Sequence, residues 1–114
     1  MSVISNQPPV LVCLSTAPSM EVATQLAQQI VQQQLAACVS FVPGAQSVYA
    51  WKGEVCTDAE VWMMIKTTQA AWPALQKAWQ TLHPYETPEL LALPVAGGLP
   101  PYIDWLIASV NVSA

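Results

Sequence analysis

The residues best able to bind a metal ion or to act as acid and base lie in one short segment. His83, the only histidine among the 114 residues, stands three positions before Glu86. An imidazole and a carboxylate at this spacing can form an acid–base pair or supply the first two ligands of a metal site. A structural interpretation is equally open, in which Pro84 and Pro88 stiffen an exposed connection, Tyr85 packs and the carboxylate bonds to backbone.

The three cysteines are the other candidate metal ligands, and they are far apart in the sequence. Cys13 and Cys38 lie in apolar stretches, where small buried thiols are common, so packing is the favoured role of each. Cys56 follows a turn in a polar stretch, where a partly exposed thiolate could hold Cu(I). A metal site normally takes three or four ligands, and no local cluster supplies them. We therefore expect copper or another divalent cation to bind weakly, with Cys56, Cys38 and His83 as candidate ligands, and any tight site to need more than one chain.

A second set of candidates could form a cleft for a small molecule. Eight of the ten charged residues fall within positions 52–89, among the few polar stretches of an apolar chain. Lys66 lies near the end of a predicted strand and could contact an anion, whereas Trp51 at a hairpin end could instead anchor a protein interface. The candidate cleft residues are Trp51, Lys66, His83, Tyr85 and Glu86.

Composition removes several classes of partner. With three lysines, no arginine and a net charge of -4, the chain lacks the basic surface that nucleic-acid binding requires. It has no run of about 20 apolar residues that could cross a membrane, and no apolar signal-peptide core near its start. Its three cysteines are an odd number, which favours reduced thiols. We therefore expect a cytoplasmic protein that binds neither nucleic acid nor membrane.

No motif for catalysis or for cofactor binding stands out. The sequence has no glycine-rich loop between a predicted strand and helix, and no serine or cysteine with a recognisable histidine partner. We predict that the protein is not an enzyme and requires no cofactor.

Hydrophobic periodicity predicts the elements that position these residues. Residues 1–9 are polar and end in two prolines, which predicts a flexible arm and leaves 10–114 as a single domain. A helix is expected after Ser19, whose side chain can cap it, with Glu21 in its first turn. The other predicted elements are strands at Val10–Leu14, Ala37–Trp51, Val55–Thr68 and Glu89–Val95, and helices at Gln69–Leu82 and Pro101–Val110.

The second and third predicted strands should form a long hairpin. Gly53 supplies the positive φ that a tight turn between them needs, and Gly44, which follows a proline, indicates a bulge. Alternation in the returning strand puts Met63 on the core face, and Trp62 and Met64 on the opposite face.

The order strand, helix, strand, strand, helix, strand, with an added C-terminal helix, predicts an α+β fold of the ferredoxin-like, split βαβ kind with an antiparallel sheet. In this plan both main helices cover one face of the sheet and leave the other bare. With 54% hydrophobic and only 9% charged residues, a lone chain cannot cover such a face with charge. We expect the face that bears Trp62 and Met64 to contact another protein chain.

Six segments together resemble the CutA family of divalent-cation tolerance proteins in order and spacing. They are Leu14–Pro18, Leu35–Val39, Pro43–Ala45, Tyr49–Glu54, Met64–Thr68 and His83–Leu90, and the resemblance extends over about residues 10–110. It implies a homotrimer of ferredoxin-like subunits in which the long hairpin joins an intersubunit sheet, and a part in tolerance of copper or other divalent metals. The family's cysteine pattern is matched well only at Cys38, since Ser15 stands where some relatives have a thiol.

Three functions are consistent with these features. The first is a CutA-like divalent-cation tolerance protein, a cytoplasmic homotrimer that responds to metal ions and has copper as a candidate ligand. The alternative is a ligand-sensing signalling trimer that binds a small anionic molecule in clefts between subunits, as similarly shaped nitrogen-signalling trimers do. The third is a purely structural or scaffolding trimer.

Overall fold

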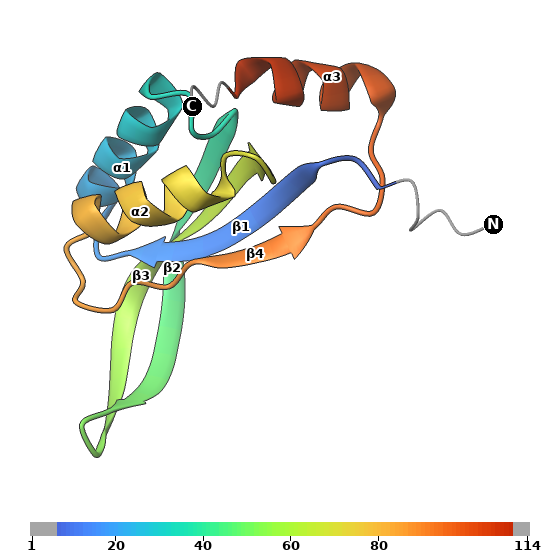
Figure 1. Ribbon diagram of the computed structural model, residues 1–114. Helices are drawn as coiled ribbons and strands as arrows, with labels where there is room; N and C mark the ends of the chain where they lie inside the picture. The colour runs from blue at the N-terminus through green and yellow to red at the C-terminus, as the bar shows by residue number, and fades with distance from the viewer. Residues whose placement is uncertain (1–6, 111–114) are drawn as a thin grey trace.

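Four antiparallel strands form one open sheet in the order β2-β3-β1-β4 (Figure 1). The computed structural model describes residues 7–110, so the predicted arm lies outside the described residues up to position 6, as do positions 111–114. The elements are β1 Val10–Ala17, α1 Met20–Gln32, β2 Cys38–Trp51, β3 Glu54–Thr68, α2 Trp72–Leu82, β4 Leu91–Pro94 and α3 Pro100–Ser109. This order and pairing confirm the predicted α+β, ferredoxin-like plan of the chain. None of the helices within residues 7–110 is long and apolar enough to cross a membrane.

Strand β1 is longer than its apolar run predicts. It pairs with β3 from Val10 to Ala17, so the prediction that it ends at Leu14 was wrong. Its residue Ser15 is fully buried and donates its hydroxyl hydrogen to the carbonyl of Glu89 at 2.6 Å. A buried hydroxyl that is hydrogen-bonded carries little penalty, which is why the strand continues through polar positions.

Helix α1 begins where its cap predicts. The Ser19 side chain accepts a hydrogen bond from the backbone N–H of Val22 at 3.2 Å, and Glu21 lies in the first turn. The helix buries one apolar face against the rest of the chain, although Val31 is 40% exposed. The buried residues of the helix are Ala23, Leu26, Ala27 and Ile30.

The hairpin of β2 and β3 is the longest feature of the sheet, and it projects beyond the other strands (Figure 1). The register shifts between Val42 and Ala45, where Gly44 has φ of +96°, which confirms the predicted bulge. Gly53 at the turn has φ of +81°, a conformation that favours glycine. Strand β1 pairs only with residues 61–68 of β3, so residues 45–60 form a two-stranded extension, called here the distal hairpin.

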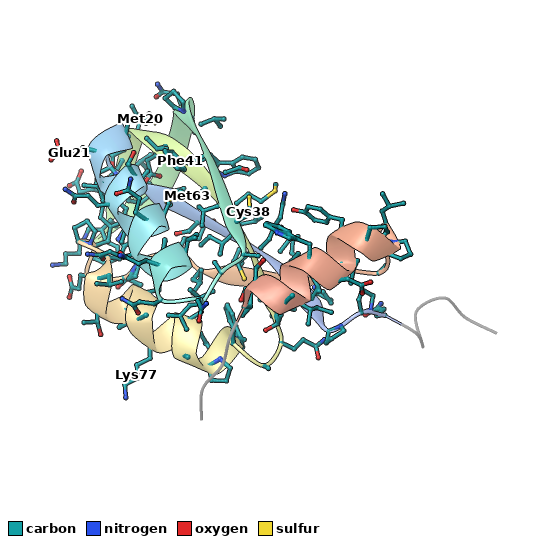
Figure 2. The ribbon with its side chains drawn as sticks, turned by 90° about the horizontal axis from the view of Figure 1, so that it is seen from above. Met20, Glu21, Cys38, Phe41, Met63 and Lys77 are labelled. Carbon is teal, nitrogen blue, oxygen red and sulfur yellow. The ribbon has the colours of Figure 1, made fainter. Side chains whose placement is uncertain are left out.

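The two faces of the sheet differ as the alternation predicts. Met63 and Ile65 are fully buried beneath the helices, and Figure 2 shows Met63 and Phe41 on the side that α1 covers. Trp62 lies on the other face and is 46% exposed. Helices α1 and α2 both lie on the first face (Figure 1). On the second face Lys66 contacts Tyr102 of α3, whereas Trp62 is left exposed in the single chain.

Three later elements begin or end away from their predicted bounds. Helix α2 starts at Trp72, not Gln69, because the Thr68 hydroxyl accepts from the N–H of Ala71 at 3.2 Å and caps a turn first. Strand β4 covers only Leu91–Pro94, since only four of its residues pair with β1. Helix α3 starts one residue early at a proline that its first turn accepts, and ends at Ser109.

Candidate functional site

The distal hairpin and the connection that follows α2 enclose a hollow of about 380 Å³. We call it the acidic hollow because three of its eight lining residues are carboxylates. Four residues come from the hairpin and four from the connection: Tyr49, Trp51, Asp58 and Glu60, and Pro84, Tyr85, Glu86 and Thr87. The two segments are joined directly, since the Tyr85 hydroxyl donates to the Glu60 carboxylate at 2.8 Å.

The connection takes its path from the residues at the end of α2. His83 is extended, with ψ of 138°, because the proline that follows disfavours a helical conformation there. Its backbone N–H still closes the helix by donating to the carbonyl of Trp79 at 2.9 Å. Its ring nitrogen Nδ1 then accepts from the backbone N–H of Tyr85 at 3.1 Å. This bond turns the chain toward the hairpin and holds Tyr85 at the hollow.

His83 is a buried structural residue in this chain, only 5% exposed, so the prediction that it lies on an exposed connection was wrong. Its Nε2 lies 2.7 Å from the carbonyl oxygen of Thr16. Because a carbonyl can only accept, Nε2 carries the hydrogen, and Nδ1 uses its lone pair on the N–H of Tyr85. Both nitrogens are therefore occupied, and neither is free to bind a metal ion in this conformation.

The electrostatics of the acidic hollow favour a positively charged ligand. The Tyr49 hydroxyl donates to Asp58, and this hydrogen bond, with desolvation and nearby negative charge, raises the pKa of Tyr49 to about 12. Burial and the hydrogen bond to Glu60 raise the pKa of Tyr85 well above its ordinary value. Both phenols therefore stay neutral at physiological pH, while the carboxylates carry negative charge. The eight lining residues include no lysine and no histidine.

The structure brings together only some of the predicted cleft residues. Trp51, Tyr85 and Glu86 line the acidic hollow, but Lys66 does not. The Lys66 ammonium instead donates to the hydroxyl of Tyr102 on α3 at 3.2 Å and lies 5.5 Å from the centre of that ring. A single chain thus does not form the predicted five-residue cleft.

Five lining residues were not among the predicted site residues: Tyr49, Asp58, Glu60, Pro84 and Thr87. Strand alternation and the hairpin register point to the first three. Asp58 and Glu60 are two positions apart on β3, so they share a face of the hairpin. Tyr49 pairs with Cys56 across the hairpin and therefore lies on the same face, diagonal to Asp58. The hairpin prediction therefore contained this group of residues, although the segment that closes the hollow is distant in sequence.

The cysteines do not come together within one chain. Cys38 begins β2 near the body of the sheet, whereas Cys56 lies near the turn of the distal hairpin. Cys13 is buried in the core, where desolvation raises the pKa of its thiol to about 11. Within residues 7–110, no group of three or more histidine, cysteine, aspartate or glutamate side chains is arranged to hold a metal ion. All three thiols are free.

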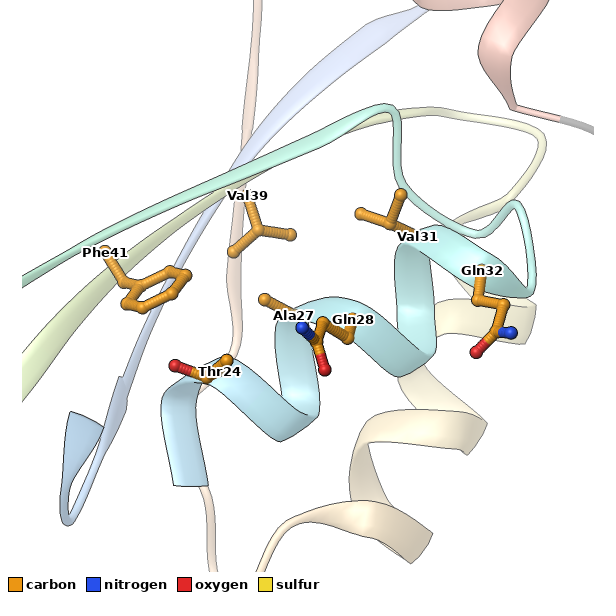
Figure 3. A pocket seen from close by; sticks show the side chains of 7 residues that line it. All are labelled: Thr24, Ala27, Gln28, Val31, Gln32, Val39 and Phe41. Carbon is orange, nitrogen blue, oxygen red and sulfur yellow. The ribbon is translucent and has the colours of Figure 1, made fainter. Parts of the chain in front are cut away.

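A larger hollow, of about 680 Å³, lies between α1 and β2 (Figure 3). Val39 and Phe41 face the helix there, and Ala27 and Val31 face the strand. Its seven lining residues include no ionisable side chain, since the remaining three are a threonine and two glutamines. This groove is suited to packing, and the acidic hollow is the place where charged and aromatic groups converge.

Comparison with known protein sequences gives one family. The sequence model of the family described as CutA1 divalent ion tolerance protein matches residues 11–109. The divalent-cation tolerance protein CutA of Thermus thermophilus is 50% identical over 95 residues, which are 83% of this chain and 92% of that protein. The chloroplastic protein CutA of Arabidopsis thaliana is 43% identical over 102 residues, which are 90% of this chain but only 56% of that longer protein.

Comparison with solved structures agrees with the sequence comparison. The crystal structure of CutA1 from Oryza sativa superposes with a TM-score of 0.89 at 41% identity, and the alignment covers 98% of this chain and 100% of that one. All eight residues of the acidic hollow lie inside the segment that the family model matches.

Proposed function

The chain belongs to the family of CutA1 divalent ion tolerance proteins, and from that premise we propose that it takes part in the response to metal ions by binding divalent cations weakly at the acidic hollow. One observation carries the proposal: the carboxylates of Asp58, Glu60 and Glu86 line one hollow that no basic side chain lines. Oxygen ligands of this kind suit hard divalent cations.

Binding at this hollow should be weak because the coordination shell is open. The hydroxyls of Tyr49 and Tyr85 already occupy one acceptor site on Asp58 and one on Glu60. Water must fill the remaining positions around a cation, and water ligands exchange and add little affinity. We expect a dissociation constant of about 10⁻⁴ M or weaker.

Calorimetry with Mn²⁺ and Zn²⁺ tests this proposal. The variants Asp58→Asn and Glu60→Gln keep the shape of the side chains and remove their charge, so each should weaken binding several-fold. Glu21→Gln, on the exposed first turn of α1, is the matched control and should leave the affinity unchanged. Submicromolar binding that survives both substitutions would contradict the proposal.

We propose copper as a separate candidate ligand, bound as Cu(I) by cysteine thiols. A soft thiolate favours Cu(I), and the half-buried Cys56 and Cys38 are the accessible sulfurs. Because these two thiols lie apart in one chain, a tight Cu(I) site would take ligands from neighbouring chains. Competition with a Cu(I) chelator should show binding that is lost in Cys56→Ser. Unchanged binding in Cys56→Ser and Cys38→Ser would contradict the assignment.

We also propose that the protein is a homotrimer. Large apolar side chains are exposed in the single chain on the second face of the sheet, on the edge strand β4 and on α3: Trp62, Leu91, Leu93 and Trp105. Such exposure is typical of surfaces that another chain covers. Light scattering should give three times the chain mass of 12.3 kDa at micromolar concentration, and Trp62→Ala should weaken assembly. A stable species of one chain mass would contradict this proposal.

The remaining functional predictions stand as proposals. Absence of catalysis is consistent with His83, whose two ring nitrogens are hydrogen-bonded and therefore unavailable as a base. For the signalling alternative, the charge of the acidic hollow favours a cationic rather than an anionic molecule, since Lys66 lies elsewhere with Tyr102. The cytoplasmic location stays a prediction, because one relative is a chloroplastic protein by name.

A further inference from the structure

We propose that the acidic hollow binds an organic cation, an ammonium or guanidinium group carried on a short aliphatic chain, against its aromatic rings and carboxylates. This inference rests on the proposed binding of cations at the hollow and names a ligand class for it. An organic cation would contact both the aromatic rings and the carboxylates of the hollow, whereas a bare metal ion would use only the carboxylates.

Three of the eight lining residues are aromatic: Tyr49, Trp51 and Tyr85. The side chains of Tyr49 and Trp51 are about two-fifths exposed, so their rings are accessible to a ligand. The negative face of an aromatic ring attracts a cation within about 6 Å of its centre, and tryptophan does so most strongly. The chain already contains one such contact, since the ammonium of Lys52 lies 5.9 Å from the centre of the Trp51 ring. An ammonium from a ligand would meet the same kind of surface in the hollow.

The hydrogen-bonding groups that remain free in the hollow are acceptors, so they suit a ligand that donates hydrogen bonds. The hydroxyl hydrogens of Tyr49 and Tyr85 are directed to Asp58 and Glu60, so neither is left to donate to a ligand. The carboxylates keep unused lone pairs, and Glu86 adds a third acceptor group. A ligand that brings N–H donors and positive charge therefore finds partners, whereas an anion finds no free phenolic donor and no basic side chain among the eight lining residues.

The size of the hollow distinguishes an organic cation from a metal ion. Its volume of about 380 Å³ lies at the small end of the usual range for organic ligands, about 300–1,000 Å³. A single metal ion would leave nearly all of this volume to water, in keeping with the weak metal binding proposed above, whereas an organic cation can fill it. An aliphatic diamine can place its methylene groups against Trp51 while its ammonium groups reach the carboxylates.

The test compares two molecules of the same shape that differ in charge. Amide chemical shifts are followed by NMR during titration with 1,4-diaminobutane and, separately, with 1,4-butanediol. We expect the diamine to cause saturable shifts centred on the distal hairpin and the connection after α2, and the diol to cause none. Equal shifts from the diol, or the absence of any saturable shift from the diamine, would overturn the inference.

Matched variants separate the contribution of the rings from that of the charges. Trp51→Leu and Glu60→Gln should each weaken diamine binding about threefold to tenfold. Trp51→Phe, which keeps an aromatic face, is the control for the first and should retain most of the affinity. Glu21→Gln, at an exposed position on α1, is the control for the second and should bind as the parent does. Diamine affinity that is unchanged in Trp51→Leu would overturn the aromatic part; Tyr49→Leu takes its place if Trp51→Leu does not fold.

The outcomes also separate this inference from the proposed function. Trp51→Leu leaves all three carboxylates in place, so Mn²⁺ binding should be unaffected in it. If Mn²⁺ binds at the hollow and the diamine does not, the organic-cation inference is wrong and the proposed function stands. If the diamine binds there and divalent ions do not, the metal proposal is wrong and this inference stands.

Discussion

The hydroxyl of Tyr85 donates to the carboxylate of Glu60 at 2.8 Å, and this bond joins two segments that are 25 positions apart in the sequence. Residues 45–60 otherwise extend beyond the strands of the main sheet and pair only with each other. An isolated two-stranded hairpin is marginally stable. The Tyr85–Glu60 bond therefore both closes the acidic hollow and fixes the distal hairpin to the body of the chain.

Loss of this bond should loosen the distal hairpin more than it destabilises the fold. Tyr85→Phe keeps the ring and removes the hydroxyl, so the free energy of unfolding should fall by only about 0.5–1.5 kcal/mol. Amide hydrogen exchange in residues 54–60 should become faster, while exchange in β1 stays slow. Exchange in the hairpin equal to that of the parent would show that the bond does not hold it.

Tyr49 and Tyr85 should each lose the phenolic proton at a higher pH than an ordinary tyrosine, and for different reasons. The pKa of Tyr49 is raised to about 12 chiefly by its hydrogen bond to Asp58, so Asp58→Asn should return it toward 10. The pKa of Tyr85 is raised first by burial and second by Glu60, so Glu60→Gln should lower it only in part. Absorbance of phenolate near 295 nm against pH measures both changes. A curve for Asp58→Asn that matches that of Glu21→Gln would contradict the assignment for Tyr49.

Replacement of His83 should cost stability and leave metal binding unchanged. His83→Ala removes the partners of the Thr16 carbonyl and of the Tyr85 N–H and opens a cavity beside Trp79, which lies 5.5 Å from the imidazole between ring centres. Unsatisfied groups and lost packing together should lower the free energy of unfolding by about 2–4 kcal/mol, as urea denaturation can measure. Zn²⁺ affinity that disappears in this folded variant would show that the imidazole is a ligand after all.

The Cys13 thiol should make stability fall at alkaline pH. Burial raises its pKa from 9.0 to about 11 in the folded chain. Between these values the unfolded state binds fewer protons than the folded state, so the free energy of unfolding decreases as pH rises from about 9 to 11. Cys13→Ala should show a smaller decrease in this window. In a thiol-reagent assay at pH 8, Cys38 and Cys56 should react first, and Cys13 only on unfolding.

Most of the fold could be predicted from the sequence because its elements are periodic and their ends carry local signals. Ser19 caps α1, Gly53 takes the positive φ of the turn, and alternation separates Met63 from Trp62. The predictions were wrong where a contact with a residue distant in the sequence determines the structure. Strand β1 continues past Leu14 because Ser15 bonds to Glu89, and no local pattern contains that contact.

Only part of the candidate site was predicted, because its other features also depend on contacts between residues distant in the sequence. Tyr85 and Glu86 were identified as a polar connection, and Trp51 as the end of a hairpin, and these three do line one hollow. Lys66 shares a strand face with Glu60, but six residues of strand separate them by about 20 Å. The burial of His83 depends on the carbonyl of Thr16, which is 67 positions away.

The most direct test of the central claim, that the acidic hollow is where this protein binds cations, is the map of paramagnetic broadening by Mn²⁺ in amide NMR spectra. Substoichiometric Mn²⁺ should first broaden the amides around Asp58, Glu60 and Glu86, and leave those of α3 sharp. The same titration of Glu60→Gln should require several-fold more Mn²⁺ for equal broadening. Broadening centred on another part of the chain, or unchanged in Glu60→Gln, would contradict the account.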